Sequence, residues 1–224
     1  MIPRRFTVTL TGKTPLLMHY DNIAWADTME AWKSDPGNKK DSKAGDDRSP
    51  AWRWLGSLYH DGKAIAIPSD NLMRAMMEGA AMVPVPGGKS GKTFKAQSQS
   101  GALVAEQFWP LLVGGREIPV GPLLALHAEK RYDRHEAAAT AAGFLLFLKR
   151  ARIGQAKHVR VRPRFDAWGT KGTLLVMDEQ ITARVVTDIW NYAGQYKGLC
   201  DWRPSSPKSP GPFGTFTAEV VEAE

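Results

Sequence analysis

The stretch HVRVRPRFDAWGTKGTLLVMDEQITARVVTDIWNYAG, residues 158–194, carries the patterns that decide the fold. Apolar and basic residues alternate over 158–165, which is typical of a half-buried strand. A second apolar run covers residues 173–177, and Trp168-Gly169 stands between the two runs. We therefore predict an antiparallel hairpin that pairs 158–165 with 173–177 and turns at Trp168-Gly169.

A helix is predicted directly after this hairpin. Asp178 can cap its amino end, and Gly198 can end it because glycine readily adopts a left-handed conformation. Between these two positions, apolar residues recur at the spacing of one helix face. They are Ile181, Val185, Ile189, Ala193 and Tyr196.

Similar patterns flank this region on both sides. Residues 5–11 alternate like a strand, and residues 64–68 and 213–221 read as two further strands. In residues 70–83 apolar side chains recur at helical spacing. The chain therefore contains strand and helix signals in nearly equal share, which predicts an α+β protein.

The order strand, helix, two strands, helix, strand is that of the ferredoxin-like fold, which RNA-recognition domains share. We expect an RRM-like antiparallel sheet core within a single domain that covers residues 1–224. Two segments do not fit this order, and we expect them to be large insertions, at 20–60 and at 85–157. The first holds four tryptophans beside a polar run, which predicts an inserted, partly flexible loop that is anchored by aromatic residues at either end.

The strongest functional signal is basic charge around the predicted strand 158–165. Residues 149–171 contain eight lysines and arginines against one aspartate. Period-two geometry places Arg160, Arg162 and Arg164 on one face, about 6.5–7 Å apart. This spacing is close to that of phosphates in an extended single strand, and each guanidinium can bind a phosphate with two hydrogen bonds. The alternative is a solvated edge strand whose charges deter aggregation.

Further cations are candidates for the same phosphate-binding surface. Those nearest in sequence are Lys157 and Arg152. A Gly/Lys/Ser-rich loop adds Lys92 and Lys95, and the segment 198–216 adds Arg203 and Lys208. In that segment Gly211 and Gly214 permit close backbone approach, and Trp202 offers a stacking face. The alternative is a rigid proline-rich crossover with a buried Trp202.

No catalytic motif in the sequence supports an enzyme, and we expect a non-catalytic protein without metal or cofactor. Gly91-Lys92-Thr93 matches the end of a phosphate-binding P-loop, but Pro86 occupies the position of the first glycine. An NTPase is therefore the least favoured alternative. The five histidines lack metal-ligand spacing, and His135 beside Glu136 indicates a surface cluster at a helix start.

Composition bounds the partners and the compartment. The 224 residues carry a formal net charge of +7, which favours an anionic partner. A single cysteine, Cys200, excludes an internal disulfide and suits a reducing compartment. The longest apolar stretch is too short to span a bilayer, and the first residues do not resemble a signal peptide. We expect a cytoplasmic protein with no membrane contact.

Several segments resemble the RAMP superfamily of CRISPR systems, especially its Cas7-like backbone subunits and their phage-encoded relatives. These segments are VRVRPRFDAW (159–168), the predicted helix at 179–195, GLCDWRPSSPKSPGPFGTF (198–216) and IPSDNLMRAMM (67–77). The resemblance implies a modified RNA-recognition fold and head-to-tail assembly along RNA or single-stranded DNA, without catalysis. It also implies that Lys13 and Arg74 lie near the binding groove.

Taken together, these patterns predict a protein that binds the backbone of single-stranded RNA or DNA. We expect it to act as a homo-oligomer or filament, or within a multisubunit ribonucleoprotein. The main alternative is a structural or inhibitory module that docks on an acidic protein surface, because net charge alone does not separate the two.

Overall fold

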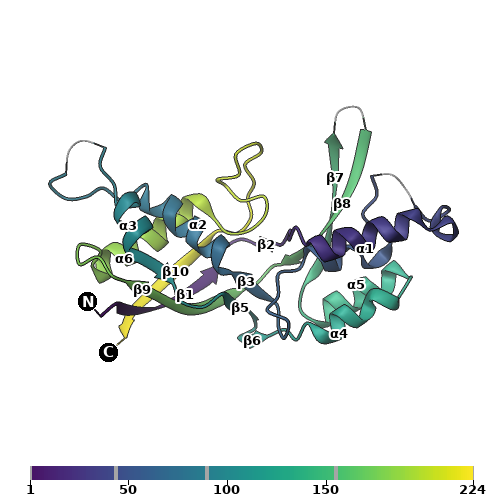
Figure 1. Cartoon of the computed structure of the whole chain (residues 1–224), viewed down its shortest axis with the longest axis horizontal. Helices are drawn as coiled ribbons and strands as arrows, with labels where there is room; N and C mark the ends of the chain where they lie inside the picture. Colours follow the sequence, from purple (N-terminus) through teal and green to yellow (C-terminus); the bar gives the residue numbers. More distant parts are fainter. Residues whose placement is uncertain (1, 43–44, 89–90, 154–155, 224) are drawn as a thin grey trace. The chain divides into compact units, whose positions relative to one another are not determined.

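The structure, a computed structural model, describes most of the chain (Figure 1). The described residues are 2–42, 45–88, 91–153 and 156–223, with the side chains of 151–157 left out. The chain divides into two compact units. Unit 1 comprises Met1–Leu16, Ala66–Glu117 and Ala167–Glu224, and unit 2 comprises Leu17–Ile65 and Ile118–Asp166.

Unit 1 is built on one antiparallel sheet in the order β10-β1-β9-β5-β3, with β4 also paired to β9 and β6 to β5. Its strands are β1 (Arg4–Gly12), β3 (Ala66–Pro68), β4 (Ala102–Val104), β5 (Phe108–Val113), β6 (Arg116–Glu117), β9 (Gly169–Val176) and β10 (Phe216–Ala223). In β1 the side chains of Phe6, Val8 and Leu10 are fully buried and alternate with partly or fully exposed ones. This alternation confirms the predicted strand at 5–11.

Helices cover one face of this sheet (Figure 1). They are α2 (Ser69–Ala80), α3 (Lys95–Gly101) and α6 (Ala183–Tyr192), which continues as a π-helical turn, Ala193–Lys197. A side chain at Gly79 of α2 would overlap the carbonyl oxygen of Ile189 in α6, so the two helices pack closely. Trp190 of α6 is fully buried and stacks on Trp109 of β5, with ring centroids 5.9 Å apart.

The helix predicted after Asp178 exists but begins later. Thr182 caps it, and its hydroxyl accepts a hydrogen bond from Val185 N. Asp178 instead accepts from Gln180 N, which makes a local turn that delays the helix. Gly198 follows the π-helical turn with a φ of 70°, as the predicted end requires.

The predicted hairpin of 158–165 with 173–177 is wrong. β8 (Ala156–Phe165) pairs with β7 (Leu145–Ile153), whereas β9 pairs with β1, β4 and β5 of unit 1. Leu174 and Val176 of β9 are buried in the sheet of unit 1. Strand alternation identifies both segments correctly, but a two-residue period carries no information about which strand is the partner.

Unit 2 combines short helices with a three-stranded sheet in the order β2-β8-β7. β2 (Leu16–Leu17) begins at the last residue of unit 1's first segment. In addition to β7 and β8, the other elements of unit 2 are α1 (Ile23–Ser34), α4 (Gly121–Leu124) and α5 (Tyr132–Ala141), with 3-10 turns at Pro36–Asn38, Ala51–Ser57 and Ala125–Ala128. β7 and β8 form a long antiparallel ribbon that extends beyond the helices of the unit (Figure 1).

The core of unit 2 gathers aromatic rings around His135. Trp54 is buried and donates a hydrogen bond from Nε1 to His135 Nδ1, at 3.0 Å. The other ring nitrogen lies 3.0 Å from the carbonyl oxygen of Glu129. His135 is therefore fully buried, and its interpretation as part of a surface cluster is wrong. Its position on α5 faces the core, where its two ring nitrogens satisfy two polar groups.

The protein is thus α+β, with antiparallel sheets, as the sequence predicts. Segment 20–60, expected as an insertion, lies within unit 2. Segment 85–157 is divided: β4, β5 and β6 belong to the sheet of unit 1, and residues 118–157 belong to unit 2. Within the described ranges, no helix combines the length and the apolar character that crossing a membrane requires.

Candidate nucleic-acid interface

The ribbon strand β8 presents its arginines on one face, as its alternation predicts. Val161, Pro163 and Phe165 are buried, whereas Arg160, Arg162 and Arg164 are partly exposed. Strand pairing aligns Lys149, Phe147 and Leu145 of β7 with these three arginines, in that order. Because directly paired residues point to the same side of a sheet, one face of the ribbon carries both basic and apolar side chains.

Two of these arginines converge on a buried carboxylate. Arg160 Nη1 lies 3.2 Å from Asp47 Oδ1, and Arg162 Nη1 lies 3.4 Å from Asp47 Oδ2. Arg53 completes the group, with Nη1 3.1 Å from Asp47 Oδ1. We call Arg53, Arg160, Arg162 and Asp47 the arginine cluster. It lies within unit 2 and brings together residues more than a hundred positions apart.

Backbone hydrogen bonds to β8 hold the carboxylate in place. Asp47 N donates to Val159 O at 2.9 Å, and Val159 N donates to Gly45 O at 2.6 Å. Residues 45–47 therefore run along the edge of β8 and deliver the Asp47 side chain beside the arginines. The neighbouring Asp46 pairs with Arg48 instead, with a shortest N–O distance of 2.6 Å.

The charge balance of the arginine cluster is positive. Three guanidinium groups surround one carboxylate, which leaves two formal positive charges on the cluster. The side chain of Asp47 is only 4% exposed, whereas those of Arg160 and Arg53 are 32% and 30% exposed. Asp47 therefore aligns the arginines from the inside while two of them stay accessible to a ligand. Arg162, 13% exposed, also lies within 3.2 Å of His19 Nε2.

Arg164 belongs to a different local arrangement. Its Nε donates to Asp166 Oδ1 at 2.6 Å, and its guanidinium carbon lies 5.6 Å from the ring centroid of Phe147. Asp166 is exposed, so this ion pair is hydrated and contributes little to stability. Arg164 retains its place on the ribbon face but lies outside the arginine cluster.

A groove of about 320 Å³ borders the arginine cluster within unit 2. Its charged lining comprises Lys33, Arg53, Arg160, Arg162, Asp21, Glu30 and Asp47. Its aromatic lining comprises His19, Tyr20, Trp25 and Trp52. We call this pocket the aromatic groove. Guanidinium groups beside flat ring faces are the combination that single-stranded nucleic-acid sites use for phosphates and bases.

No protein-family model matches the chain, and no curated protein matches it in sequence. The interpretation of the site therefore depends on its own geometry.

Sequence reasoning missed Arg53 and Asp47, which complete the arginine cluster. Arg53 stands between Trp52 and Trp54 in a 3-10 turn, and Asp47 lies within the polar run 34–49. Neither position carries a periodic signal. The predicted contacts Arg152 and Lys157 are register partners near the tip of the ribbon, and their side chains lie outside the described residues.

The remaining predicted contacts, Lys92, Lys95, Arg203 and Lys208, belong to unit 1. Lys92, Lys95 and Lys208 are exposed. Arg203 is buried, with 7% of its surface exposed, and its two terminal nitrogens donate to Glu78 at 2.7 and 2.9 Å. Arg203 thus links α2 to the segment 198–216, and we leave it out of the proposed interface.

The segment 198–216 is organised around Trp202. This residue stacks on Phe213, with ring centroids 5.3 Å apart, and a side chain at Gly211 would overlap it. Gly214 has a φ of 72°, and a side chain there would overlap Leu199. The two glycines do permit close backbone approach, but the groups that approach belong to the segment itself. This geometry favours the alternative of a rigid crossover.

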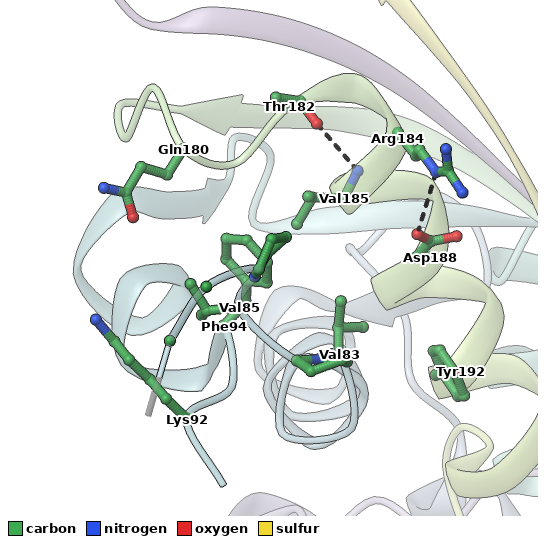
Figure 2. A pocket seen from close by; sticks show the side chains of 14 residues that line it. Val83, Val85, Lys92, Phe94, Gln180, Thr182, Arg184, Val185, Asp188 and Tyr192 are labelled. Atoms are coloured by element: carbon green, nitrogen blue, oxygen red, sulfur yellow. Dashed lines mark hydrogen bonds and ion pairs between the residues drawn. The ribbon is translucent and has the colours of Figure 1, made fainter. Parts of the chain in front are cut away.

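Gly91-Lys92-Thr93 lies in a loop between two helices, α2 and α3. Val85 N donates to Lys92 O, so the loop folds back on itself before α3 begins. The strand that precedes a phosphate-binding P-loop is replaced here by helix α2, which does not favour an NTPase. Unit 1 contains a pocket of about 900 Å³ beside this loop. Among the side chains that line it, Lys92 and Arg184 lie on opposite sides of apolar ones (Figure 2).

The ion pair between Arg203 and Glu78 predicts a pH dependence of unit 1. Burial alone would raise the pKa of Glu78, but hydrogen bonds from Arg203 and Ser205 outweigh it and lower the pKa to about 2. A carboxylate whose pKa is lowered by folding stabilises the protein above its unfolded pKa, and this stability is lost as the pH falls towards the folded value.

We therefore expect the free energy of unfolding to fall by about 1.5–3 kcal/mol between about pH 5 and pH 2, through loss of hydrogen bonds to a charged group. Urea titrations at stepped pH values should show a loss larger by this amount in the parent chain than in Glu78→Gln, because the pKa values of Asp61 and Glu106 are also lowered and add a pH dependence that both proteins share. The variant Glu219→Gln, at an exposed position of β10, should behave like the parent chain. Identical profiles for parent and Glu78→Gln would contradict the prediction.

Proposed function

We propose that this protein binds the phosphate backbone of single-stranded RNA or DNA through the arginine cluster, as a binding subunit and not as a catalyst. The observation that carries the proposal is the convergence of three arginines on one buried carboxylate, which leaves two formal positive charges. A phosphate that approaches Arg160 and Arg53 meets guanidinium groups whose positions are already fixed. Such preorganisation lowers the entropic cost of binding.

The fold of unit 1 supports the same class of function. Along the chain its main elements follow in the order β1, α2, β5, β9, α6 and β10, and the strands lie in the sheet in the order β10-β1-β9-β5. We propose that these elements form a ferredoxin-like core, because that fold alternates strands and helices in this order. Multimeric assembly of the Cas7-like kind, along one strand of nucleic acid, is part of the proposal. Unit 2 would supply the binding face for each copy.

Removing one exposed arginine of the cluster tests this function. Fluorescence anisotropy of a labelled 20-nucleotide strand, titrated over a range of salt concentrations, gives the slope of the logarithm of the binding constant against the logarithm of the salt concentration. For Arg160→Gln the magnitude of this slope should be smaller than in the parent chain by about 0.7, the value for one phosphate contact on a single strand. Affinity should fall about five- to tenfold at low salt, through loss of one charge-assisted hydrogen bond. Binding should weaken equally for strands of different sequence, because a phosphate contact carries no base preference.

The control is Lys171→Gln, which removes one exposed positive charge from β9 of unit 1. This variant should change affinity only slightly, because it leaves the arginine cluster intact. If both variants lower the slope equally, binding reflects net charge and the proposed site is wrong. If the parent chain binds no single strand of 10, 20 or 40 nucleotides at low salt, the alternative of docking on an acidic protein surface replaces the proposal. A multimer on nucleic acid predicts affinity that increases with strand length.

A further inference from the structure

The aromatic groove contains two ring systems in different environments. Tyr20 is 41% exposed and rests on Tyr59, with ring centroids 5.2 Å apart. Trp25 is half-buried and contacts Trp52 at 5.5 Å between ring centroids. Trp52 is itself buried, so Trp25 has a rigid support and keeps part of its surface towards solvent. Partly exposed rings with firm support are suited to stacking with a flat ligand.

Local structure fixes the position of Trp25. Asn22 caps α1, and its side-chain oxygen accepts hydrogen bonds from Ala24 N and Trp25 N. A side chain at Gly56 would press against Trp25 Cβ at 2.9 Å, so the glycine allows the tryptophan to pack closely. The indole is thereby held at both its backbone and its Cβ. Rings that are held in this way lose little entropy when a ligand stacks on them.

Charge and size indicate what the groove accepts. Four cations and three carboxylates line it, which leaves one formal positive charge. Asp47 pairs with three of these cations, and Glu30 lies 3.9 Å from the fourth, Lys33. A volume of about 320 Å³ is at the small end of ligand pockets. The groove therefore suits a small, flat, uncharged ring that is joined to an anionic group.

We infer that the aromatic groove stacks one nucleobase of the bound strand, next to the phosphates held by the arginine cluster. This inference rests on the proposed function, because Arg53, Arg160 and Arg162 line the groove as well as forming the cluster. Arg160, Tyr20 and Trp25 line the same groove, so a phosphate bound to Arg160 would bring its base into the groove that holds these rings. Stacking on rings is tolerant of sequence, so any of the four bases would fit.

An oligonucleotide without bases separates base stacking in the aromatic groove from phosphate binding by the arginine cluster. A 15-nucleotide thymidine strand and an abasic strand of equal length have the same phosphates, but only the first has rings to stack. We expect the abasic strand to bind about 5- to 150-fold more weakly, which corresponds to about 1–3 kcal/mol for one stacked base. Tyr20→Ala should reduce this preference for the thymidine strand and leave the affinity for the abasic strand and the salt slope unchanged.

Tyr196→Ala is the matched control, because Tyr196 is a tyrosine of similar exposure, 46% against 41% for Tyr20, and is located in unit 1. It should keep the full preference for bases. A second variant, Trp25→Leu, tests the other ring, and thermal unfolding reports whether it folds. A 2-aminopurine base in the strand should lose fluorescence on binding to the parent chain and regain it with Tyr20→Ala or Trp25→Leu.

Each failure has a distinct pattern. Equal affinity for the thymidine and abasic strands, with a normal salt slope for both, overturns base stacking and leaves the phosphate site in place. Loss of the preference in Tyr196→Ala as well as in Tyr20→Ala overturns the location in the aromatic groove. If neither strand binds at low salt, the proposed function itself fails.

Discussion

Replacing Asp47 with asparagine is expected to lower the free energy of unfolding by about 3 kcal/mol. The substitution keeps the shape of the side chain but leaves Arg53, Arg160 and Arg162 without their common counterion. Loss of one partner from a buried ion pair costs about 3–5 kcal/mol. We take the lower end because two of the three arginines are about one-third exposed and remain hydrated.

The same variant should bind single-stranded nucleic acid more tightly at low salt. Its arginine cluster carries three formal positive charges in place of two, and a phosphate can take the place of the missing carboxylate. Urea unfolding measures the loss of stability. Anisotropy measures the gain in affinity, at about 10–20 °C below the thermal unfolding midpoint of the variant, so that the variant stays folded. Stability and affinity are thus expected to change in opposite directions.

Asp166→Asn provides the comparison, because Asp166 also pairs with an arginine of β8 but is exposed. It should change stability by less than about 1 kcal/mol, as is usual for surface ion pairs. An equal effect of the two substitutions would show that Asp47 is hydrated like a surface residue. Unchanged stability of Asp47→Asn, combined with unchanged affinity, would remove the arginine cluster as the basis of the site.

The sequence allowed half of the arginine cluster to be predicted. The period-two pattern of HVRVRPRF is local information, and it placed Arg160 and Arg162 correctly on the exposed face of a strand. Asp47 and Arg53 reach the same place through the fold of unit 2, across more than a hundred residues for the pair Asp47–Arg160. Such a contact depends on chain topology and leaves no periodic trace in the sequence.

The partners of β8 and β9 in their sheets also could not be predicted from local patterns. Both segments have the composition of strands, and their closeness in sequence favoured a hairpin. Trp168-Gly169 instead marks the passage from unit 2 to unit 1, near Ala167, where the chain changes unit. The turn signal in the sequence is real, but it does not tell whether β9 pairs with β8 or with strands that are distant in the sequence.

Charge in the sequence also does not report exposure. Arg203 and Arg160 look alike as basic residues in polar surroundings, yet Arg203 is buried against Glu78. His135 is similar: its neighbours Arg134 and Glu136 are exposed, but it faces the core. On a helix, adjacent positions point in different directions, so a charged neighbour predicts little about burial.

Gly172→Ala is expected to destabilise unit 1 by about 3 kcal/mol, near the upper end for overpacking a core. Gly172 lies in the middle of β9, and a methyl group there would overlap the indole of Trp109. The indole cannot move aside easily. It is fully buried, donates to Glu106 at 2.9 Å, and stacks on Trp190. A glycine inside a strand often marks such a close approach.

Urea unfolding followed by tryptophan fluorescence measures this effect, and Gly121→Ala is its control. A methyl group at Gly121 would meet nothing within 4 Å, so that substitution should stay within about 0.5 kcal/mol of the parent chain. Glu106 also accepts a hydrogen bond from Thr173 N, next to Gly172, and so ties the indole to β9. If Gly172→Ala is as stable as Gly121→Ala, Trp109 does not cross β9 at this position. The packing of β5 against β9, on which the sheet order of unit 1 depends, would then be wrong.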